Sequence, residues 1–408
     1  MLACYEDIAP LTQDGVFLKT LAVTMAVTCG FLISKTTYDA FRRHHARAAF
    51  VVIGGGPCGL ITALIVARTG KASRIVIYEE KHRSELVNRP QQLAFEQKNV
   101  HFLKSFGVDF DNMEGCWQHK RFFTRIGVFT EYMLSIIYRL DVPIAVHLNQ
   151  KFTRDGLKSL EAFTERLIVI ACDGSHGRSA SLLGLSDEFV HHSCKAYGAV
   201  AALDRTSGQV IPAPEIRVHN LTFDLHAYGN NSHEETFPQG FHLKIFGSLR
   251  HRYMALAVPK CESRLVKTLK VVLDQSVMRS IFQACYNAYK TEDESNLTDL
   301  SAVKSMKFSP RLFEIKLSQR MEVAAFVQDA NLFVITEGEA ARVVNFHSGM
   351  DVNLVIKSLY SLETFIHMAV PAESEAAILK ALQYKCSHSK TITQEYLRCG
   401  IRESMFMC

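Results

Sequence analysis

The chain has 408 residues, of which 48% are hydrophobic and 21% are charged. This composition is typical of a folded globular protein, and it excludes a disordered, collagen-like or low-complexity chain. A net charge of +5 is too small for a dedicated nucleic-acid-binding protein. The eleven cysteines form no C-x-x-C pair, so we expect no metal site and interpret them as reduced thiols of a cytoplasmic protein.

An apolar segment, 20–33, lies near the N-terminus between Lys19 and Lys35. It has about 14 residues, whereas a membrane-spanning helix needs about 20. It also begins too late for a secretory signal, and acidic rather than basic residues precede it. We therefore expect a buried helix here, with a membrane-surface anchor as the alternative.

The next elements alternate between strands and helices. Continuous apolar runs predict buried parallel strands, and helices with 3.6-residue periodicity lie between them. The predicted strands are 49–53, 74–78, 143–147, 167–171 and 332–336, and the predicted helices are 60–68, 93–106, 130–140 and 349–367. From about 195 to 260 the pattern becomes that of an antiparallel sheet, followed by helical segments over 262–290 and a strand over 313–318.

The first strand ends in the run Gly54-Gly55-Gly56-Pro57-Cys58-Gly59, which fits G-x-G-x-x-G between a strand and a helix. Gly54 permits a tight turn, Gly56 lets a pyrophosphate approach the backbone, and Gly59 lets the helix pack on the strand. Glu79 follows the next strand at the expected offset and can accept hydrogen bonds from a ribose. An acidic residue at this position favours FAD or NAD over NADP.

Two later motifs favour FAD. After Arg89 and a helix, the chain carries the first of these motifs, Ala171-Cys172-Asp173-Gly174. The other follows the strand 332–336 and consists of Glu337-Gly338-Glu339 and His347-Ser348-Gly349-Met350. In order and spacing these runs resemble the FAD-dependent monooxygenases of the para-hydroxybenzoate hydroxylase type, over about residues 48–365. The glycine run and the helical leader also resemble the MICAL monooxygenase domain.

The resemblance implies a fold and a set of site residues. The fold is α/β, with a Rossmann-like FAD-binding domain, an inserted, mainly antiparallel β-sheet substrate domain and helical termini. The implied domains are a leader (1–47), the FAD-binding domain (48–190 and 310–365), the sheet domain (191–309) and C-terminal helices (366–408). The cofactor-binding residues would be Gly54, Gly56, Pro57, Cys58, Gly59, Glu79, Arg89, Asp173, Glu339, Gly349 and Met350, with His347 beside the flavin.

The resemblance further implies a monooxygenase that uses FAD, NADH or NADPH, and O2 to hydroxylate a small-molecule or protein substrate. Arg252 and Tyr253 are candidate substrate contacts on the sheet. The chain departs from the family motifs at Gly177, Ala180, Glu339, Arg342, Phe346 and Asp351. These departures leave two alternatives open, namely an FAD-dependent oxidase or dehydrogenase that needs no NAD(P)H, and a degenerate flavoprotein fold that acts as a binding or regulatory module.

Overall fold

The computed structural model describes residues 15–405 except 90, 119, 161–162, 164, 205–214, 222–240, 248–250 and 293. By its internal contacts the chain divides into two compact units, Met1–Arg47 and Ala48–Cys408. The finer division of the second unit into an FAD-binding and a sheet domain stays a prediction.

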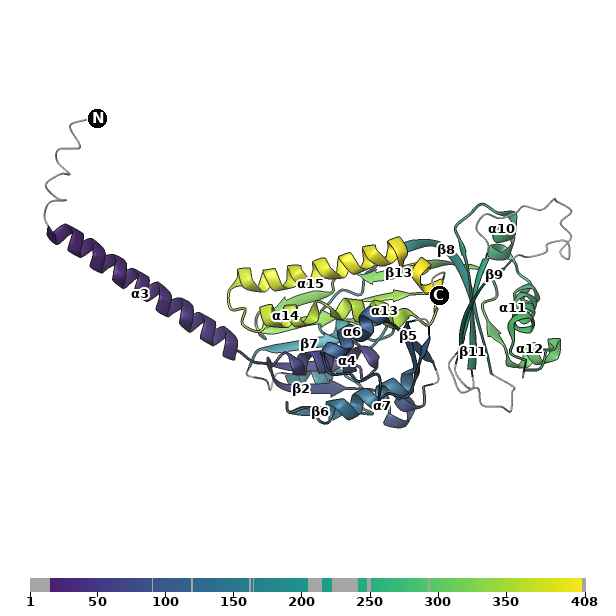
Figure 1. Cartoon of the computed structure of the whole chain (residues 1–408), viewed down its shortest axis with the longest axis horizontal. Coiled ribbons are helices and arrows are strands. Elements are labelled where there is room, and N and C mark those ends of the chain that lie inside the picture. The colour runs from purple at the N-terminus through teal and green to yellow at the C-terminus, as the bar shows by residue number, and fades with distance from the viewer. Residues whose placement is uncertain are drawn as a thin grey trace, which may run out of the picture. The chain divides into compact units, whose positions relative to one another are not determined.

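The first unit contains one long helix, α3 (Gly15–His45), which Figure 1 shows in purple. The expected apolar segment is therefore only part of a helix of 31 residues. Within it, Lys19–Arg42 is long and apolar enough to cross a membrane. The prediction of a buried helix is wrong, because the described side chains of that stretch are exposed, as Val27 (66%) and Phe31 (66%) illustrate.

The second unit is built around a six-stranded sheet in the order β14-β15-β7-β1-β2-β6. All neighbouring strands are parallel except β14 and β15, which pair antiparallel. The strands are β1 (Ala48–Ile53), β2 (Ala72–Tyr78), β6 (Ile144–His147), β7 (Leu167–Ala171), β14 (Ala324–Val327) and β15 (Leu332–Thr336). β1, β7 and β15 are buried along their whole length, as their continuous apolar sequences predict.

Helices cover this sheet. α4 (Pro57–Arg68) connects β1 to β2 and packs on α7 (Ile126–Ile137) and α14 (Leu362–Ala369). Nine of its residues are buried, so it is a core helix rather than a surface one. Shorter helices lie in the connections, namely α5 (Arg83–Val87), α8 (Arg154–Leu160) and α9 (Ser179–Leu182).

A small antiparallel sheet, ordered β3-β5-β4, corrects one prediction. Its strands are β3 (Gln92–Glu96), β4 (Cys116–Gln118) and β5 (Arg121–Arg125). The predicted helix 93–106 therefore begins later, as α6 (Gln97–Ser105). Hydrogen bonding of β3 to β5, whose paired residues lie 25 to 33 positions later, overrides the helical pattern.

The second large sheet is antiparallel, in the order β16-β13-β8-β11-β10-β9, with β12 paired to β8. Its strands are β8 (Phe189–Asp204), β9 (Glu215–Leu221), β10 (Phe241–Gly247), β11 (His251–Pro259), β12 (Lys307–Phe308), β13 (Phe313–Arg320) and β16 (Arg342–Val344). Three helices, α10 (Arg264–Val271), α11 (Gln275–Tyr289) and α12 (Asp299–Ser305), lie on one side of it, away from the parallel sheet (Figure 1).

The C-terminal part is helical, as predicted. α13 (Asp351–Leu359) and α14 are followed by the long α15 (Glu375–Glu395), a π-helical turn η3 (Tyr396–Gly400) and α16 (Ile401–Met405). A short 3-10 turn, η2 (Gly338–Ala340), follows β15. α15 packs on α13, α14 and β14, so the end of the chain helps to enclose the parallel sheet.

Candidate functional site

The glycine-rich turn at the end of β1 has the conformation that its sequence predicts. Gly54 has a φ of +106°, and a Cβ at this position would lie 2.5 Å from the carbonyl oxygen of Cys172. A Cβ on Gly59 would lie 1.8 Å from the carbonyl oxygen of Gly54. Both positions therefore require glycine, Gly54 because of its positive φ and the close Cys172 carbonyl, and Gly59 because the first turn of α4 touches the strand end directly.

The start of α4 is suited to an anion. Its N-cap, Gly56, provides no side-chain hydrogen bond, and Pro57 follows at the first helical position. The first backbone N–H groups of a helix have no acceptor within the helix, and they carry a partial positive charge. A Cβ on Gly56 would meet no atom within 4 Å, so space for a phosphate exists at this point.

Glu79 lies just past β2 and is buried, with 6% of its surface exposed. Its Oε2 accepts a hydrogen bond from the Gly55 N–H at 2.6 Å, and its Oε1 accepts one from the Lys81 N–H at 2.8 Å. The carboxylate therefore ties the glycine turn to the end of β2. Each of its oxygens retains a second lone pair, so a ribose hydroxyl can still donate to it.

Two thiols lie beneath the turn. The Sγ atoms of Cys58 on α4 and Cys172 after β7 are 3.8 Å apart, and the Thr62 hydroxyl is 3.8 Å from Cys172 Sγ. The hydrogen bond to Cys172, together with burial, raises the pKa of the Cys58 thiol well above its ordinary value. Cys58 is therefore a neutral thiol, and it contributes small size rather than charge to the turn.

The Asp-Gly motif follows β7. Asp173 Oδ2 accepts a hydrogen bond from the Ser179 N–H at 3.0 Å, so its carboxylate holds the loop that starts α9. A Cβ on Gly177 would lie 2.0 Å from the Asp173 side chain, which explains why the chain has glycine at this departure from the family motif. A Cβ on Gly174 would lie 4.0 Å from Glu339 Oε2, so the second and third motifs are close together.

The third motif places Glu339 on η2 and His347 and Gly349 before α13. Desolvation, and then the negative charge of Asp351, raises the pKa of Glu339, although its side chain keeps contact with solvent. His347 Nδ1 lies 3.6 Å from Asp351 Oδ2, and this contact raises the pKa of His347. The side chain of Glu339 therefore lies in a polar cluster at the start of α13.

Other residues of the third motif point away from this cluster. Arg342 is buried and donates to the Ser389 hydroxyl at 2.5 Å on α15. Glu337 is buried in an ion pair with Lys385 and accepts a hydrogen bond from Ser358. Arg342, one of the departures from the motif, therefore anchors the C-terminal helix rather than the site.

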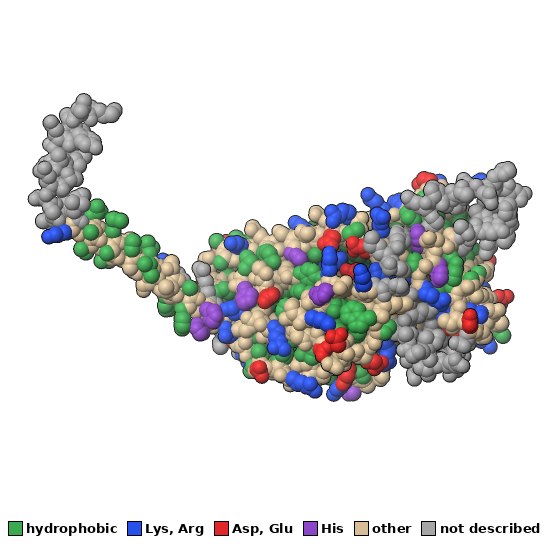
Figure 2. All heavy atoms as spheres, viewed as in Figure 1, with side chains coloured by type: hydrophobic (Ala, Val, Ile, Leu, Met, Phe, Trp, Pro, Cys, Tyr) green, Lys and Arg blue, Asp and Glu red, His purple; other side chains and the backbone are tan. Residues whose placement is uncertain are grey.

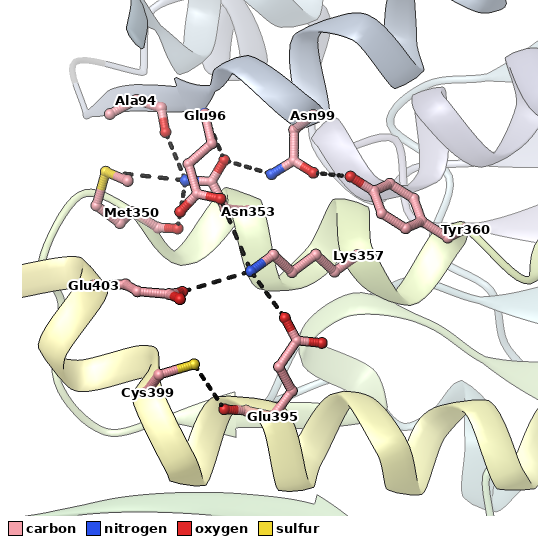
Figure 3. A network of polar contacts seen from close by, with 10 residues as sticks. All are labelled: Ala94, Glu96, Asn99, Met350, Asn353, Lys357, Tyr360, Glu395, Cys399 and Glu403. Carbon is pink, nitrogen blue, oxygen red and sulfur yellow. Dashed lines mark hydrogen bonds and ion pairs between the residues drawn. The ribbon is translucent and has the colours of Figure 1, made fainter. Parts of the chain in front are cut away.

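One cavity of about 1220 Å³ joins the three motifs. Nine of the predicted cofactor-binding residues line it, namely Gly54, Gly56, Pro57, Cys58, Glu79, Arg89, Asp173, Glu339 and Gly349. Gly59 does not, because it packs α4 on the strand. Met350 does not either, because its buried side chain faces a polar network on the other side of α13, which Figure 3 shows. The cavity's opposite wall comes from β8, β10, β11 and β12.

Of the two predicted substrate contacts on the antiparallel sheet, one lies away from the cavity and the other lines it. Arg252 is wholly buried, and its NH2 pairs with Glu294 Oε2 at 2.6 Å, so it does not reach the cavity. Side chains alternate along a strand, and Tyr253 next to it does line the cavity. Its ring stacks on Phe246 with centroids 5.4 Å apart. Burial, and then the charge of Asp204, raises the pKa of Tyr253.

Sequence reasoning missed two cavity residues. Gln92 on β3 and Ser179 on α9 are buried, and the side-chain N and O atoms of Gln92 and the Oγ of Ser179 have no hydrogen-bond partner within the described chain. Gln92 lies three positions after Arg89, and Ser179 lies six positions after Asp173. This closeness in sequence to the motif residues was the one signal that could have identified them as cavity residues. Unpaired buried polar groups are costly, so they indicate a polar ligand in the cavity.

Among residues 15–405 that the structure describes, no cluster of three or more His, Cys, Asp or Glu side chains could hold a metal ion.

Comparisons with known proteins agree with this geometry. Residues 47–127 match the model of an FAD-binding domain family. No curated protein matches the chain. Among solved structures, CtdE in complex with FAD and a substrate aligns at a TM-score of 0.50 and 10% identity, covering 87% of this chain and 88% of that one.

Two further structures are similar. The p-nitrophenol 4-monooxygenase PnpA from Pseudomonas putida aligns at a TM-score of 0.48 and 14% identity, with 85% of this chain and 86% of that one covered. The tetracycline destructase Tet(55) aligns at 0.49 and 11% identity, with 88% of each chain covered. The MICAL resemblance stays a prediction. Residues 47–127 therefore match an FAD-binding domain family, and the chain shares its overall fold with CtdE, a protein solved in complex with FAD.

Proposed function

We propose that the protein is an FAD-dependent monooxygenase that uses NADH or NADPH and O2 to hydroxylate its substrate. One observation carries the proposal, namely that a single cavity is lined by the glycine turn, the Asp-Gly loop, the start of α13 and the antiparallel sheet. A cavity of about 1220 Å³ is larger than an ordinary small-molecule pocket of roughly 300–1,000 Å³. It has room for a dinucleotide and a second molecule.

The residues of the cavity fit FAD. The N–H groups at the start of α4 would hold the pyrophosphate, Glu79 the adenosine ribose, and Glu339 the ribityl chain. The N-cap Met350 of α13 also provides no side-chain hydrogen bond, so the N–H groups that follow Gly349 would face the pyrimidine side of the flavin. Gln92 and Ser179 offer unpaired polar atoms inside the same space.

When bound, FAD would supply the redox chemistry, and the protein would supply position and environment. The stacked rings of Phe246 and Tyr253, with Phe308, would form an apolar wall that excludes water and orients a substrate. His347 and Arg89 would bring positive charge to the cavity beside Glu339, since both lower the pKa of that carboxyl. We propose no general base.

The test begins with the absorbance spectrum of the purified full-length chain with FAD. We expect bound flavin, slow NAD(P)H oxidation alone and faster oxidation with a suitable substrate, with NADH and NADPH compared directly. Flavin reduction by substrate without NAD(P)H under anaerobic conditions would indicate an oxidase or dehydrogenase instead. A colourless protein that gains no thermal stability with FAD would contradict both and favour a binding module.

A further inference from the structure

The helix α3 has the dimensions of a membrane span. Its apolar stretch Lys19–Arg42 has 24 residues and a mean hydropathy of 1.3. At 1.5 Å per residue this stretch is about 36 Å long. The hydrocarbon core of a bilayer is about 30 Å thick, so the helix can cross it with its ends at the headgroups.

The distribution of apolar side chains distinguishes a span from a helix that lies on a surface. The large exposed apolar residues in the first part of the stretch are Leu21, Val23, Met25, Val27, Phe31, Leu32 and Ile33, and none of the window is buried within the described chain. At about 100° per residue these positions surround the helix instead of forming one stripe. Figure 2 shows hydrophobic side chains along this helix. A surface helix would instead have one charged face.

Threonine hydroxyls in the stretch are satisfied internally. The hydroxyls of Thr24 and Thr28 donate to the carbonyls four residues earlier, Thr20 and Thr24, each at 2.8 Å. Thr37 donates to the carbonyls of Ile33 and Ser34 at 2.9 Å. In a bilayer every polar group needs a partner within the protein, and these threonines already have one.

The charges at the two ends differ. The sequence has no Lys or Arg before Lys19, but it has Glu6, Asp7 and Asp14. At the other end of the stretch it has one acidic residue, Asp39, against Arg42, Arg43 and Arg47, with His44 and His45 between the last two arginines. Positive charge collects on the cytoplasmic side of membrane spans. Lys35 lies toward the same end, where its long side chain can reach the headgroups.

From these observations we infer that α3 spans a lipid bilayer once, with the FAD-binding unit Ala48–Cys408 on the cytoplasmic side. The helix stays attached in the mature protein. This inference does not depend on the proposed function, because the two units are separate in their internal contacts.

The first experiment measures membrane association of the full-length chain. We expect the protein to remain in the membrane pellet in high salt and in alkaline carbonate, and to dissolve only in detergent. The double substitution V27K/F31K should move most of it to the soluble fraction, whereas the matched control V27L/F31L should not. Both variants should melt at the same temperature as the wild type in detergent, which shows that the second unit is folded.

Several outcomes would overturn the inference. A wild-type chain that stays soluble without detergent would overturn it, including a chain that pairs with a second copy through α3. Release by high salt or carbonate would indicate a surface contact. A detergent-extracted protein whose mass lacks the N-terminal segment would indicate a cleaved signal sequence.

The second experiment tests orientation with protease. The FAD-binding unit should be digested in inverted vesicles and protected in intact spheroplasts of the expression host, and R42E/R47E should weaken this asymmetry. Digestion in spheroplasts and protection in inverted vesicles would refute the assigned orientation. FAD binding and turnover are not part of either readout, so a failed function test leaves these results interpretable.

Discussion

Gly56 and Gly59 stand three residues apart in one turn, yet the structure gives them different tasks. A Cβ on Gly59 would meet backbone at 1.8 Å, whereas a Cβ on Gly56 would enter open space within the cavity. Gly56 also has an ordinary φ of −72°, which alanine adopts without strain. Folding and cofactor binding can therefore be separated at these two positions.

We predict that Gly59→Ala lowers the free energy of unfolding of the FAD-free protein by about 3 kcal/mol, because strand and helix must separate. Gly56→Ala should change it by less than about 0.5 kcal/mol but weaken FAD binding more than about tenfold, because its methyl group occupies the place of a phosphate. Denaturant unfolding and FAD titration measure the two effects. Equal losses of stability in both variants would contradict this assignment.

Gln92 illustrates the cost of a binding group without its ligand. We predict that Gln92→Met stabilises the FAD-free protein by about 1 kcal/mol, because a buried amide without partners is replaced by an apolar side chain of similar size. The same change should weaken FAD binding about tenfold if the amide bonds the cofactor. Gln97→Met, at the exposed start of α6 and outside the cavity, is the control. Loss of stability in Gln92→Met would show that the amide has a structural partner.

Glu339 gives a pH dependence with a definite sign. Its pKa is raised in the folded protein by desolvation and Asp351, so ionisation destabilises the fold. This penalty is absent below the ordinary glutamate pKa and grows as pH rises through the raised value. We predict that, without FAD, Glu339→Gln melts increasingly above the wild type as the pH rises from the ordinary glutamate pKa of about 4.3 to the raised pKa, and by a constant margin above it. A difference that shrinks over this range would contradict the raised pKa.

At the scale of elements, α13 connects the end of the chain to the small sheet. Figure 3 shows Asn353, whose Oδ1 accepts from the Glu96 N–H at 2.9 Å and from Asn99 Nδ2 at 2.7 Å. One turn later, Lys357 Nζ lies within 3.8 Å of carboxylates on β3, α15 and α16. Burial lowers the pKa of Lys357, but the three carboxylates outweigh it and raise the pKa. The start of α13, which faces the cavity, is thereby fixed.

We predict that Lys357→Met lowers the free energy of unfolding by about 2 kcal/mol, because three partly buried carboxylates lose their shared cation. Hydrogen exchange should increase first in α15 and α16. Lys380→Met on the exposed side of α15 is the matched control, with an expected change below about 0.5 kcal/mol. A similar loss in both variants would mean that the network contributes little.

At the scale of the whole molecule, the fold of the second unit begins at Ala48, the first residue of a fully buried strand. We predict that a chain lacking residues 1–47 binds FAD as the full-length protein does in detergent. Both should gain about 2.7 kcal/mol of stability at an FAD concentration 100 times the Kd. Thermal melts across an FAD series measure this. A truncated chain that melts lower or fails to bind FAD would show that the leader contributes to the fold.

The sequence by itself determined the local parts of this protein. Strands 167–171 and 332–336 were predicted to the residue, because a buried parallel strand is a continuous apolar run. The conformation of the glycine turn and the position of Glu79 could also be predicted, because both depend on contacts within one βαβ unit. The strand β3 and the exposure of the described side chains of α3 could not be predicted, because strand pairing and burial depend on distant segments.

Only the tertiary structure decided which side chains meet. It brought Asp173, Glu339 and Tyr253 to one cavity from segments more than 70 residues apart. It also removed Arg252 and Arg342 from the site by pairing them with Glu294 and Ser389 elsewhere in the core. The physical reason is that burial obliges each polar group to find a partner, and the partner's identity depends on the packing of distant elements. A sequence motif determines local backbone geometry, whereas the set of side chains in a binding site depends on which distant segments pack beside that motif.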